Sequence, residues 1–342
     1  MRLLFIGFGV VGQGLTRLLL GGRESLRDRF GFAPMITGVV TGSHGSLAHP
    51  AGLDMEALLR ASAAGGLAQY PQRAGLLRDE GSLPLIQAGL ADVLVEVSPT
   101  NLVDAQPALD TCRAALDQGM HLVLANKGPV CLTAAGLEDH ARQRGRQLRY
   151  EATVMAGTPV VSMSRETLAS SGLRAARGIL NGTCNYMLTQ MEAGMNYADA
   201  LAQAQALGYA ESDPRADVEG HDAASKAVIL AWALFGRSLR LDDMSIEGIT
   251  GLDGGDIRTA LDAGERWKLI ASIDEGGASV APQRLPLTHP LAAVAGVSNA
   301  LTWTTDNLQE VTIVGPGAGA EATGQGLLAD LLAIHRHPRV DS

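Results

Sequence analysis

The stretch Leu3-Leu4-Phe5-Ile6-Gly7-Phe8-Gly9-Val10-Val11-Gly12 lies at the start of this 342-residue chain. Its first four apolar residues predict a buried strand, and the glycines after them open a helix whose apolar stripe reaches Leu19. In a strand–glycine–helix unit the first glycine makes the tight turn, the second lets a pyrophosphate approach the backbone, and the third packs the helix on the strand. The stretch therefore predicts a dinucleotide-binding domain with Gly7, Gly9 and Gly12 at the phosphates.

The second strand is predicted at 35–41, where a domain specific for NAD usually carries a carboxylate for the ribose diol. No Asp or Glu occurs between Asp28 and Asp54, so nothing at this strand end repels the 2′-phosphate of NADP. No Lys or Arg occurs between Arg29 and Arg60 either, and the remaining local candidates are Thr41, Ser43 and His44. The choice between NAD and NADP therefore stays open.

Two further strands are predicted at 93–97 and 121–125, with a helix at 104–118 between them. This alternation indicates a doubly wound parallel sheet, in which ligands bind outside the carboxyl ends of the strands. Ser98 follows one such end, and Lys127 follows another in the predicted loop 126–129. We expect both residues to border the nicotinamide, although Lys127 is also compatible with an ordinary solvated loop position.

The pattern changes after about residue 153. Segments typical of strands then recur without regular crossover helices, at 175–181, 245–250, 279–285 and 299–305. This α+β pattern predicts a second domain with a mixed or antiparallel sheet. The expected fold class is thus α/β, with a Rossmann dinucleotide-binding domain over 1–130, a substrate-binding domain over 131–310, and a C-terminal strand, loop and helix over 311–342 that returns to the first domain.

A second informative segment runs from Leu207 to Lys226 and concentrates carboxylates in the turn before an apolar helix. Asp222 and Lys226 are four residues apart, so they share one helix face where the polar turn meets the buried part of the helix. An ammonium that is partly desolvated and flanked by carboxylates can exchange a proton. The alternative is an exposed helical ion pair, which is common and contributes a few tenths of a kcal/mol.

Glu211 and Asp217 shift the interpretation toward a site. Like charges cluster at a cost in free energy unless a cationic group or a ligand uses them. An amino-acid substrate, whose ammonium needs a carboxylate partner, meets this requirement. The segment therefore predicts a substrate site that contains Glu211, Asp217, Asp222 and Lys226.

Composition limits the other function classes. The formal charge of −9, without a basic run interleaved with aromatic residues, argues against nucleic acid as a partner. The apolar runs are too short for a signal peptide or a membrane span, so the chain is predicted to be cytoplasmic. Three cysteines without a CxxC or Cys/His spacing exclude a zinc site; Cys112 is expected in the core, whereas Cys131 and Cys184 lie near predicted functional loops.

With these residues placed, the chain resembles the homoserine dehydrogenase family over essentially its whole length. The most specific block is 204–226, which contains Gly208-Tyr209-Ala210-Glu211, Asp213-Pro214, Asp217-Val218, Gly220, Asp222 and Lys226. The other matching blocks follow in order: 7–12, Ser98-Pro99-Thr100-Asn101, Ala125-Asn126-Lys127, Glu151-Ala152-Thr153-Val154, 181–186 and Gly315-Pro316-Gly317-Ala318-Gly319.

The resemblance implies a reversible NAD- or NADP-dependent interconversion of L-homoserine and L-aspartate 4-semialdehyde, a step toward threonine and methionine. It assigns Lys226 as the proton donor, Lys127 as a second active-site lysine, and Glu211 and Asp222 as substrate-binding residues. It also implies that the dinucleotide is lined by Gly9, Val10, Val11, Ser98, Lys127 and Gly319.

Further expectations follow from the resemblance alone. The family binds a monovalent cation, usually sodium, through backbone carbonyls that fall on Glu151, Val154, Ala156 and Thr158. Family members form dimers through the middle domain, so a homodimer is expected. Many bacterial members carry a regulatory ACT domain after this region, whereas this chain resembles the short form without it.

The sequence is also compatible with two rival functions. Chemistry like that of aspartate-semialdehyde dehydrogenase would need Cys131 or Cys184 as a low-pKa nucleophile beside a histidine base. A non-catalytic dinucleotide sensor would share the fold but would need no proton donor. The physiological direction of the reaction and regulation through a cysteine are not decided by the sequence.

Overall fold

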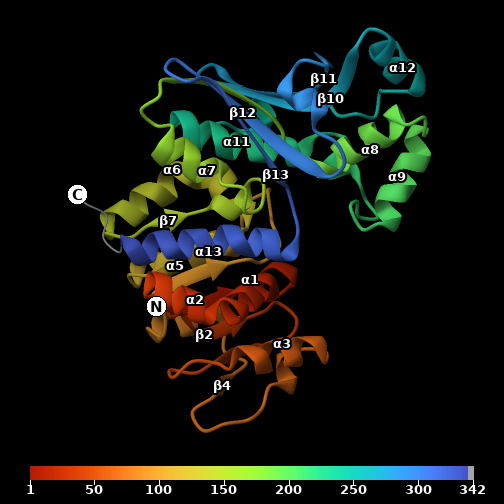
Figure 1. Ribbon diagram of the computed structural model, residues 1–342. Coiled ribbons are helices and arrows are strands. Elements are labelled where there is room, and N and C mark those ends of the chain that lie inside the picture. Colours follow the sequence, from red (N-terminus) through yellow and green to blue (C-terminus); the bar gives the residue numbers. More distant parts are fainter. Residues whose placement is uncertain (338–342) are drawn as a thin grey trace. The chain divides into compact units, whose positions relative to one another are not determined.

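A computed structural model describes residues 1–337, which form two compact units (Figure 1). The first unit is Met1–Gly157 together with the segment from Gly319 onward, and the second is Thr158–Ala318. The divisions fall at 157/158 and 318/319, whereas the sequence placed them at 130/131 and 310/311. The first division falls later than predicted because the helix that begins at Lys127 and one more parallel strand still belong to the first unit.

The first unit is built on a seven-stranded sheet of order β4-β3-β2-β1-β5-β6-β7. Five strands are parallel, namely β1 (Arg2–Ile6), β2 (Met35–Val40), β5 (Val93–Glu96), β6 (His121–Leu124) and β7 (Leu148–Arg149). Two short strands, β3 (Ser46–Ala48) and β4 (Leu77–Arg78), add an antiparallel edge beside β2. The central strands are buried on both faces, as a doubly wound sheet requires, so the predicted fold class is confirmed.

The helices of this unit are α1 (Val10–Gly21), α2 (Arg23–Phe30), α3 (Met55–Ala63), α4 (Ser82–Gln87), α5 (Ala108–Asp117), α6 (Lys127–Gln143) and α13 (Ala320–Arg336). The last helix, α13, packs against the first, α1 (Figure 1). Glycines permit this close packing: a Cβ on Gly14 would overlap the Ala320 carbonyl oxygen, and one on Gly324 would lie 2.7 Å from the Leu15 nitrogen.

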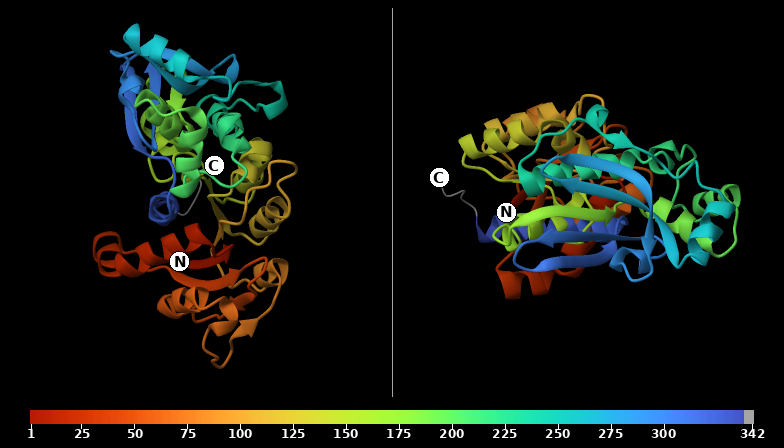
Figure 2. Two further views of the ribbon diagram at one scale, coloured as in Figure 1. Left: turned by 90° about the vertical axis from the view of Figure 1, so that its right-hand side faces the viewer. Right: turned by 90° about the horizontal axis from the view of Figure 1, so that it is seen from above.

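The second unit contains a six-stranded sheet of order β13-β12-β8-β10-β11-β9. Its strands are β8 (Leu173–Ile179), β9 (Ser245–Ile246), β10 (Glu265–Asp274), β11 (Gly277–Pro286), β12 (Ser298–Thr305) and β13 (Gln309–Pro316). All neighbours are antiparallel except β9, which runs parallel to β11, so the sheet is mixed as predicted. The face of this sheet that is turned to the viewer on the right of Figure 2 has no helix over it.

The helices of the second unit pack on the other face or extend from the edge of the sheet. They are α7 (Val160–Ser162), α8 (Gly182–Glu192), α9 (Tyr197–Ala206), α10 (Arg215–Val218), α11 (His221–Phe235) and α12 (Gly254–Asp262). Helix α11 contacts β10 and β11, and its central turns from Ala223 to Ala231 are buried on every side. Gly236 ends the helix in a left-handed conformation, as predicted. No helix within residues 1–337 has an apolar run long enough to cross a membrane.

Strand β7 ends at Arg149, after which the Glu151 N–H donates to the Asp330 carboxylate (2.8 Å) and the chain enters a 3-10 turn. Two other parts of the chain differ from the sequence-based prediction. The loop expected at 126–129 is the first turn of α6, with a non-helical residue at Thr133. Strand β10, which the sequence pattern did not predict, occupies the middle of the second sheet.

Candidate active site

The glycine loop after β1 has the geometry that a pyrophosphate requires. Gly7 adopts a φ of +94°, and a Cβ there would lie 2.6 Å from the Val97 carbonyl oxygen. At Gly12 a Cβ would lie 3.3 Å from the Gly7 oxygen, so the start of α1 packs tightly on the strand. A Cβ on Gly9 would meet nothing within 4 Å, and Val10 beside it is 69% exposed. The loop is thus closed toward the sheet and open where phosphate oxygens would approach the amide groups.

Gly319 belongs to the same unit. It precedes α13 with a φ of +120°, and its carbonyl accepts the Thr323 N–H (2.8 Å). The next residue, Ala320, is the one that contacts Gly14 of α1. The structure therefore places the sequence-predicted residue Gly319 beside the helix that follows the glycine loop.

The carboxyl ends of β5 and β6 carry a buried network that includes Ser98. The Ser98 hydroxyl and N–H both donate to the same Glu96 oxygen, the N–H at 2.9 Å. The Asn126 amide donates to the Ser98 hydroxyl (3.1 Å) and to the Pro99 carbonyl (3.3 Å). Because β5 and β6 are neighbours, this network joins the two strand ends at which the sequence predicted nicotinamide contacts.

Glu96 is a residue of this network that the sequence reasoning missed. It is fully buried, and desolvation raises the pKa of its carboxyl group. Glu96 could have been found from the sequence because it is the last residue of an otherwise apolar strand. A carboxylate in that position needs hydrogen-bond donors around it. The network orients Ser98 and Asn126 and so fixes the local shape of this edge.

Lys127 begins α6. Asn126 caps the helix by accepting the Gly128 N–H (3.0 Å), and the Lys127 N–H faces the Thr100 hydroxyl (3.4 Å). The side chain of Lys127 is half-buried rather than fully solvated. Ser98 and Lys127 therefore lie at the ends of neighbouring strands on one edge of the first sheet.

In the second unit, Lys226 lies on the first turns of α11 and is 8% exposed. Its ammonium donates to an Asp222 carboxylate oxygen and to the Leu180 carbonyl oxygen, both at 2.7 Å. The side chains of Lys226 and Asp222 are only 11% and 16% exposed, which excludes the alternative of an exposed helical ion pair. A buried ammonium with two fixed oxygen acceptors keeps one donor position for another oxygen.

Asn181 organises the carboxylates around Lys226. Its amide nitrogen donates to Asp217 (2.7 Å) and to the same Asp222 oxygen that Lys226 contacts (2.9 Å). Its amide oxygen caps α8 by accepting the Cys184 N–H (2.8 Å). Desolvation, with a smaller effect of the Asp222 charge, raises the pKa of the Asp217 carboxyl group. No role was predicted for Asn181, although an Asn-Gly-Thr run before a helix is a recognisable cap signal.

The remaining carboxylates of the acidic segment have separate environments. Asp213 pairs with Arg215 (2.6 Å), which lowers the pKa of Asp213 to about 2. Glu219 lies 3.4 Å from His221. Glu211 is exposed in the turn before α10, and its carboxylate is not part of the Asn181 network. The structure therefore brings Asp217, Asp222 and Lys226 together, with Glu211 outside this cluster.

The cysteines do not form a nucleophilic site. All three are buried, and burial raises the pKa of the Cys131 thiol to about 11. The Cys184 thiol donates to the Asp217 carbonyl oxygen (3.2 Å), and its pKa is also raised by burial. Neutral, buried thiols are poor nucleophiles, which argues against thioester chemistry. Within residues 1–337, no group of His, Cys, Asp and Glu side chains has the arrangement of a metal site.

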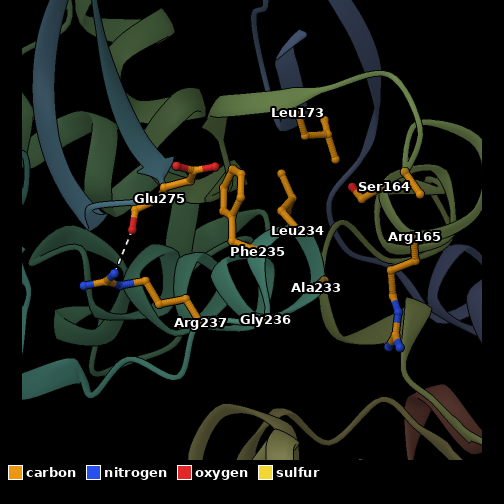
Figure 3. A pocket seen from close by; sticks show the side chains of 10 residues that line it. Ser164, Arg165, Leu173, Ala233, Leu234, Phe235, Gly236, Arg237 and Glu275 are labelled. Atoms are coloured by element: carbon orange, nitrogen blue, oxygen red, sulfur yellow. Dashed lines mark hydrogen bonds between the residues drawn. The ribbon is translucent and has the colours of Figure 1, made fainter. Parts of the chain in front are cut away.

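A cavity of about 700 Å³ lies at the other end of α11, around Leu234, Phe235 and Arg237 (Figure 3). At one side of the cavity Arg237 donates to the Glu275 carbonyl oxygen (2.7 Å). At a rise of 1.5 Å per residue, the nine steps along α11 from Lys226 to Phe235 span about 14 Å. None of the sequence-predicted site residues lines this cavity, so it is separate from the Lys226 cluster.

The chain is similar to known proteins of one family. The family model for homoserine dehydrogenase matches residues 159–332. A relative from Pseudomonas canavaninivorans, named NAD(+)-dependent homoserine dehydrogenase, is 41% identical over 98% of this chain and 96% of its own. A homoserine dehydrogenase from Methanocaldococcus jannaschii is 35% identical over 98% of both chains.

Solved structures show the same similarity. A homoserine dehydrogenase from Thiobacillus denitrificans superimposes with a TM-score of 0.85 at 29% identity, covering 100% of this chain and 76% of that one. A hyperthermophilic archaeal homoserine dehydrogenase in complex with NADPH gives a TM-score of 0.84 at 28% identity over 99% of both chains.

Proposed function

The chain belongs to the homoserine dehydrogenase family, and from this premise we propose how its own residues carry out the reaction. As a member of that family it is an NAD(P)-dependent oxidoreductase that interconverts L-homoserine and L-aspartate 4-semialdehyde. The observation that carries the proposal is the buried Lys226 ammonium, held by Asp222 and the Leu180 carbonyl.

Lys226 is the proton donor when the aldehyde is reduced and the proton acceptor when homoserine is oxidised. The dinucleotide supplies or accepts the hydride, and the chain contributes the position of the substrate and the proton. Two of the donor directions of Lys226 are fixed by protein oxygens, so a third can meet the carbonyl oxygen of the substrate. Asp222 keeps the ammonium in place, and Asn181 keeps Asp222 in place.

We assign the amino group of homoserine to the carboxylates Glu211, Asp217 and Asp222. Glu211 is exposed and lies in the same polar segment, where a ligand ammonium can reach it. Replacing Glu211 with Leu is expected to raise the KM for homoserine more than it lowers kcat, because a ground-state contact is lost. An unchanged KM in steady-state assays would remove Glu211 from substrate binding.

We propose that the first unit holds the dinucleotide. Gly7, Gly9, Val10, Val11 and Gly12 form the loop toward the pyrophosphate, while Ser98, Lys127 and Gly319 lie at the same edge of the sheet or beside α1. The open space at Gly9 and the blocked space at Gly7 support this assignment. Both cofactors occur among relatives, since one is named NAD(+)-dependent and another was solved with NADPH.

A monovalent cation, sodium by resemblance, is proposed on the backbone carbonyls of Glu151, Val154, Ala156 and Thr158. Met155 and Ala156 both have a positive φ angle of 54°, so the carbonyl groups of this loop do not point as they would in a helix or a strand. This supports the proposal that they bind a cation. The bare face of the second sheet supports a homodimer through that unit. A biosynthetic activity of this kind is proposed to operate in the cytoplasm.

The test of the function uses purified protein, L-homoserine and either NAD or NADP, with reduced-nicotinamide absorbance as the signal. Turnover with at least one cofactor is expected. Cofactor binding without turnover in either reaction direction would contradict the enzymatic function and favour a dinucleotide sensor.

A further inference from the structure

A carboxylate lies beside β2 at the edge of the first sheet, although the residues next to β2 in the sequence include no Asp or Glu. Strand β3 is antiparallel to β2, and β4 is antiparallel to β3, so β4 runs parallel to β2. The carboxyl end of β4 therefore lies at the same edge as the carboxyl end of β2, where dinucleotides bind in sheets of this kind. Asp79 is the residue that follows β4.

Asp79 lies directly against the turn after β2. Its N–H donates to the Ser46 carbonyl (3.2 Å), and one of its carboxylate oxygens lies 2.9 Å from where a Cβ on Gly45 would stand. The turn from Thr41 to Gly45 is closed by the Thr41 N–H and hydroxyl, which both donate to the Gly45 carbonyl (3.1 and 2.8 Å). Asp79 itself has a φ of 57°, a left-handed conformation that Asp tolerates better than most residues.

The Asp79 carboxylate is not neutralised by its neighbours. The adjacent Arg78 directs its guanidinium to the Gln72 side chain and to the Leu67 and Tyr70 carbonyls, at 3.0, 3.4 and 2.6 Å. Asp79 is exposed, and within residues 1–337 its carboxylate has no hydrogen bond or ion pair. A ligand at this strand end therefore meets a negative side chain, and the nearest arginine donors are already engaged.

We propose that Asp79 selects NAD over NADP in this chain, acting from β4 in place of the carboxylate that usually follows β2. The inference rests on the proposed dinucleotide site in the first unit. A 2′-phosphate on the adenosine ribose carries up to two negative charges and is repelled by a neighbouring carboxylate, whereas a 2′-hydroxyl can donate to it. The segment between Asp28 and Asp54 left the choice between NAD and NADP open. That choice is thus made by Asp79, about 25 positions after Asp54.

The experiment measures the dissociation constants of NAD and NADP by calorimetry for the wild-type enzyme and for Asp79→Asn, which keeps the shape and removes the charge. We expect wild type to bind NAD at least about tenfold more tightly than NADP, and the variant to lose most of that ratio through tighter NADP binding. Glu24→Gln is the matched control, because Glu24 is an exposed carboxylate on α2 of the same unit, a helix that shares a pocket with Met35 at the start of β2. Its ratio should equal that of wild type.

Salt provides a second readout, because repulsion between exposed charges is screened as ionic strength rises. The NAD/NADP ratio of wild type should fall between low and high salt, whereas that of Asp79→Asn should change less. A wild-type enzyme that binds NADP as tightly as NAD, or an Asp79→Asn variant with the wild-type ratio, would overturn the inference. Failure of wild type to bind either cofactor would instead overturn the proposed dinucleotide site, so the two failures are distinguishable.

Discussion

At the scale of single residues, Asn181 holds two roles that are usually separate. Its side-chain oxygen caps α8, and its side-chain nitrogen holds Asp217 and Asp222 beside Lys226. A helix cap contributes about 1 kcal/mol, so fold stability and site geometry both depend on this one amide.

Replacing Asn181 with Asp separates the two roles. Asp caps a helix as well as Asn does, but it adds a third carboxylate to Asp217 and Asp222 and removes the donor that they share. We expect kcat/KM for homoserine to fall by about 10-fold to 100-fold, equivalent to about 1.4 to 2.8 kcal/mol. The matched control is Asn196→Asp, at the exposed cap of α9, which should retain wild-type kinetics. Equal kinetics for the two variants would show that the Asn181 amide does not organise the site.

His121 gives a prediction about pH. Burial, assisted by the charge of Arg146 and opposed by Asp92, lowers the pKa of His121 to about 4 from its usual 6.5. Its unprotonated Nδ1 accepts the Gln147 N–H (3.0 Å), a bond that the protonated ring cannot keep. Between these two pH values the unfolded chain binds a proton that the folded chain does not. This contribution to stability is therefore present above pH 6.5 and is lost as the pH falls toward 4.

The loss amounts to about 3 kcal/mol, at 1.36 kcal/mol per pKa unit. Urea unfolding of wild type and His121→Asn at several pH values measures it, since the Asn oxygen replaces Nδ1 as an acceptor without titrating. The difference in unfolding free energy between the two proteins should shrink as the pH falls from 7 to 4. A difference that is independent of pH would mean that His121 does not titrate in this range.

At the scale of elements, the contact between α1 and α13 depends on residues without side chains. Replacing Gly14 with Ala forces a methyl group into the Ala320 carbonyl, so the helices must separate. Overpacking of this kind costs about 1 to 3 kcal/mol. Gly21→Ala is the control on the same helix, because a Cβ there meets nothing within 4 Å. Thermal melts should show a lower Tm for Gly14→Ala only; a Tm equal to that of the control would show that the two helices do not pack this closely.

The elements also show what the sequence could predict. The glycine loop, the main parallel strands and the end of α11 at Gly236 follow from local patterns, and the structure contains them. Strands β3 and β4 have three and two residues, too few for any periodicity, so the sequence could not place Asp79 beside the carboxyl end of β2. The start of α6 was missed because Pro129 resembles a loop residue, although proline is tolerated in the first turn of a helix.

At the scale of the whole molecule, the proposed site residues are divided between the two units. The first unit has the loop and strand ends that suit a dinucleotide, and the second has the buried lysine and its carboxylates. The spacing of four residues between Asp222 and Lys226 predicted that their side chains lie together on one face of a helix. Leu180 and Asn181 precede α8 in the sequence. The Leu180 carbonyl meets Lys226 and the Asn181 amide meets Asp222 only through the tertiary fold, so no local pattern revealed them.

The central claim is that Lys226 transfers the proton, and the most direct test is Lys226→Met, which keeps the length of the side chain and removes the ammonium. Turnover of homoserine and the cofactor dissociation constant are measured on the same preparation. We predict that kcat falls by about 10² to 10⁴, the usual effect of losing a general acid or base, while cofactor affinity stays within about twofold. Turnover close to that of wild type would contradict the assignment and move the proton transfer to another group.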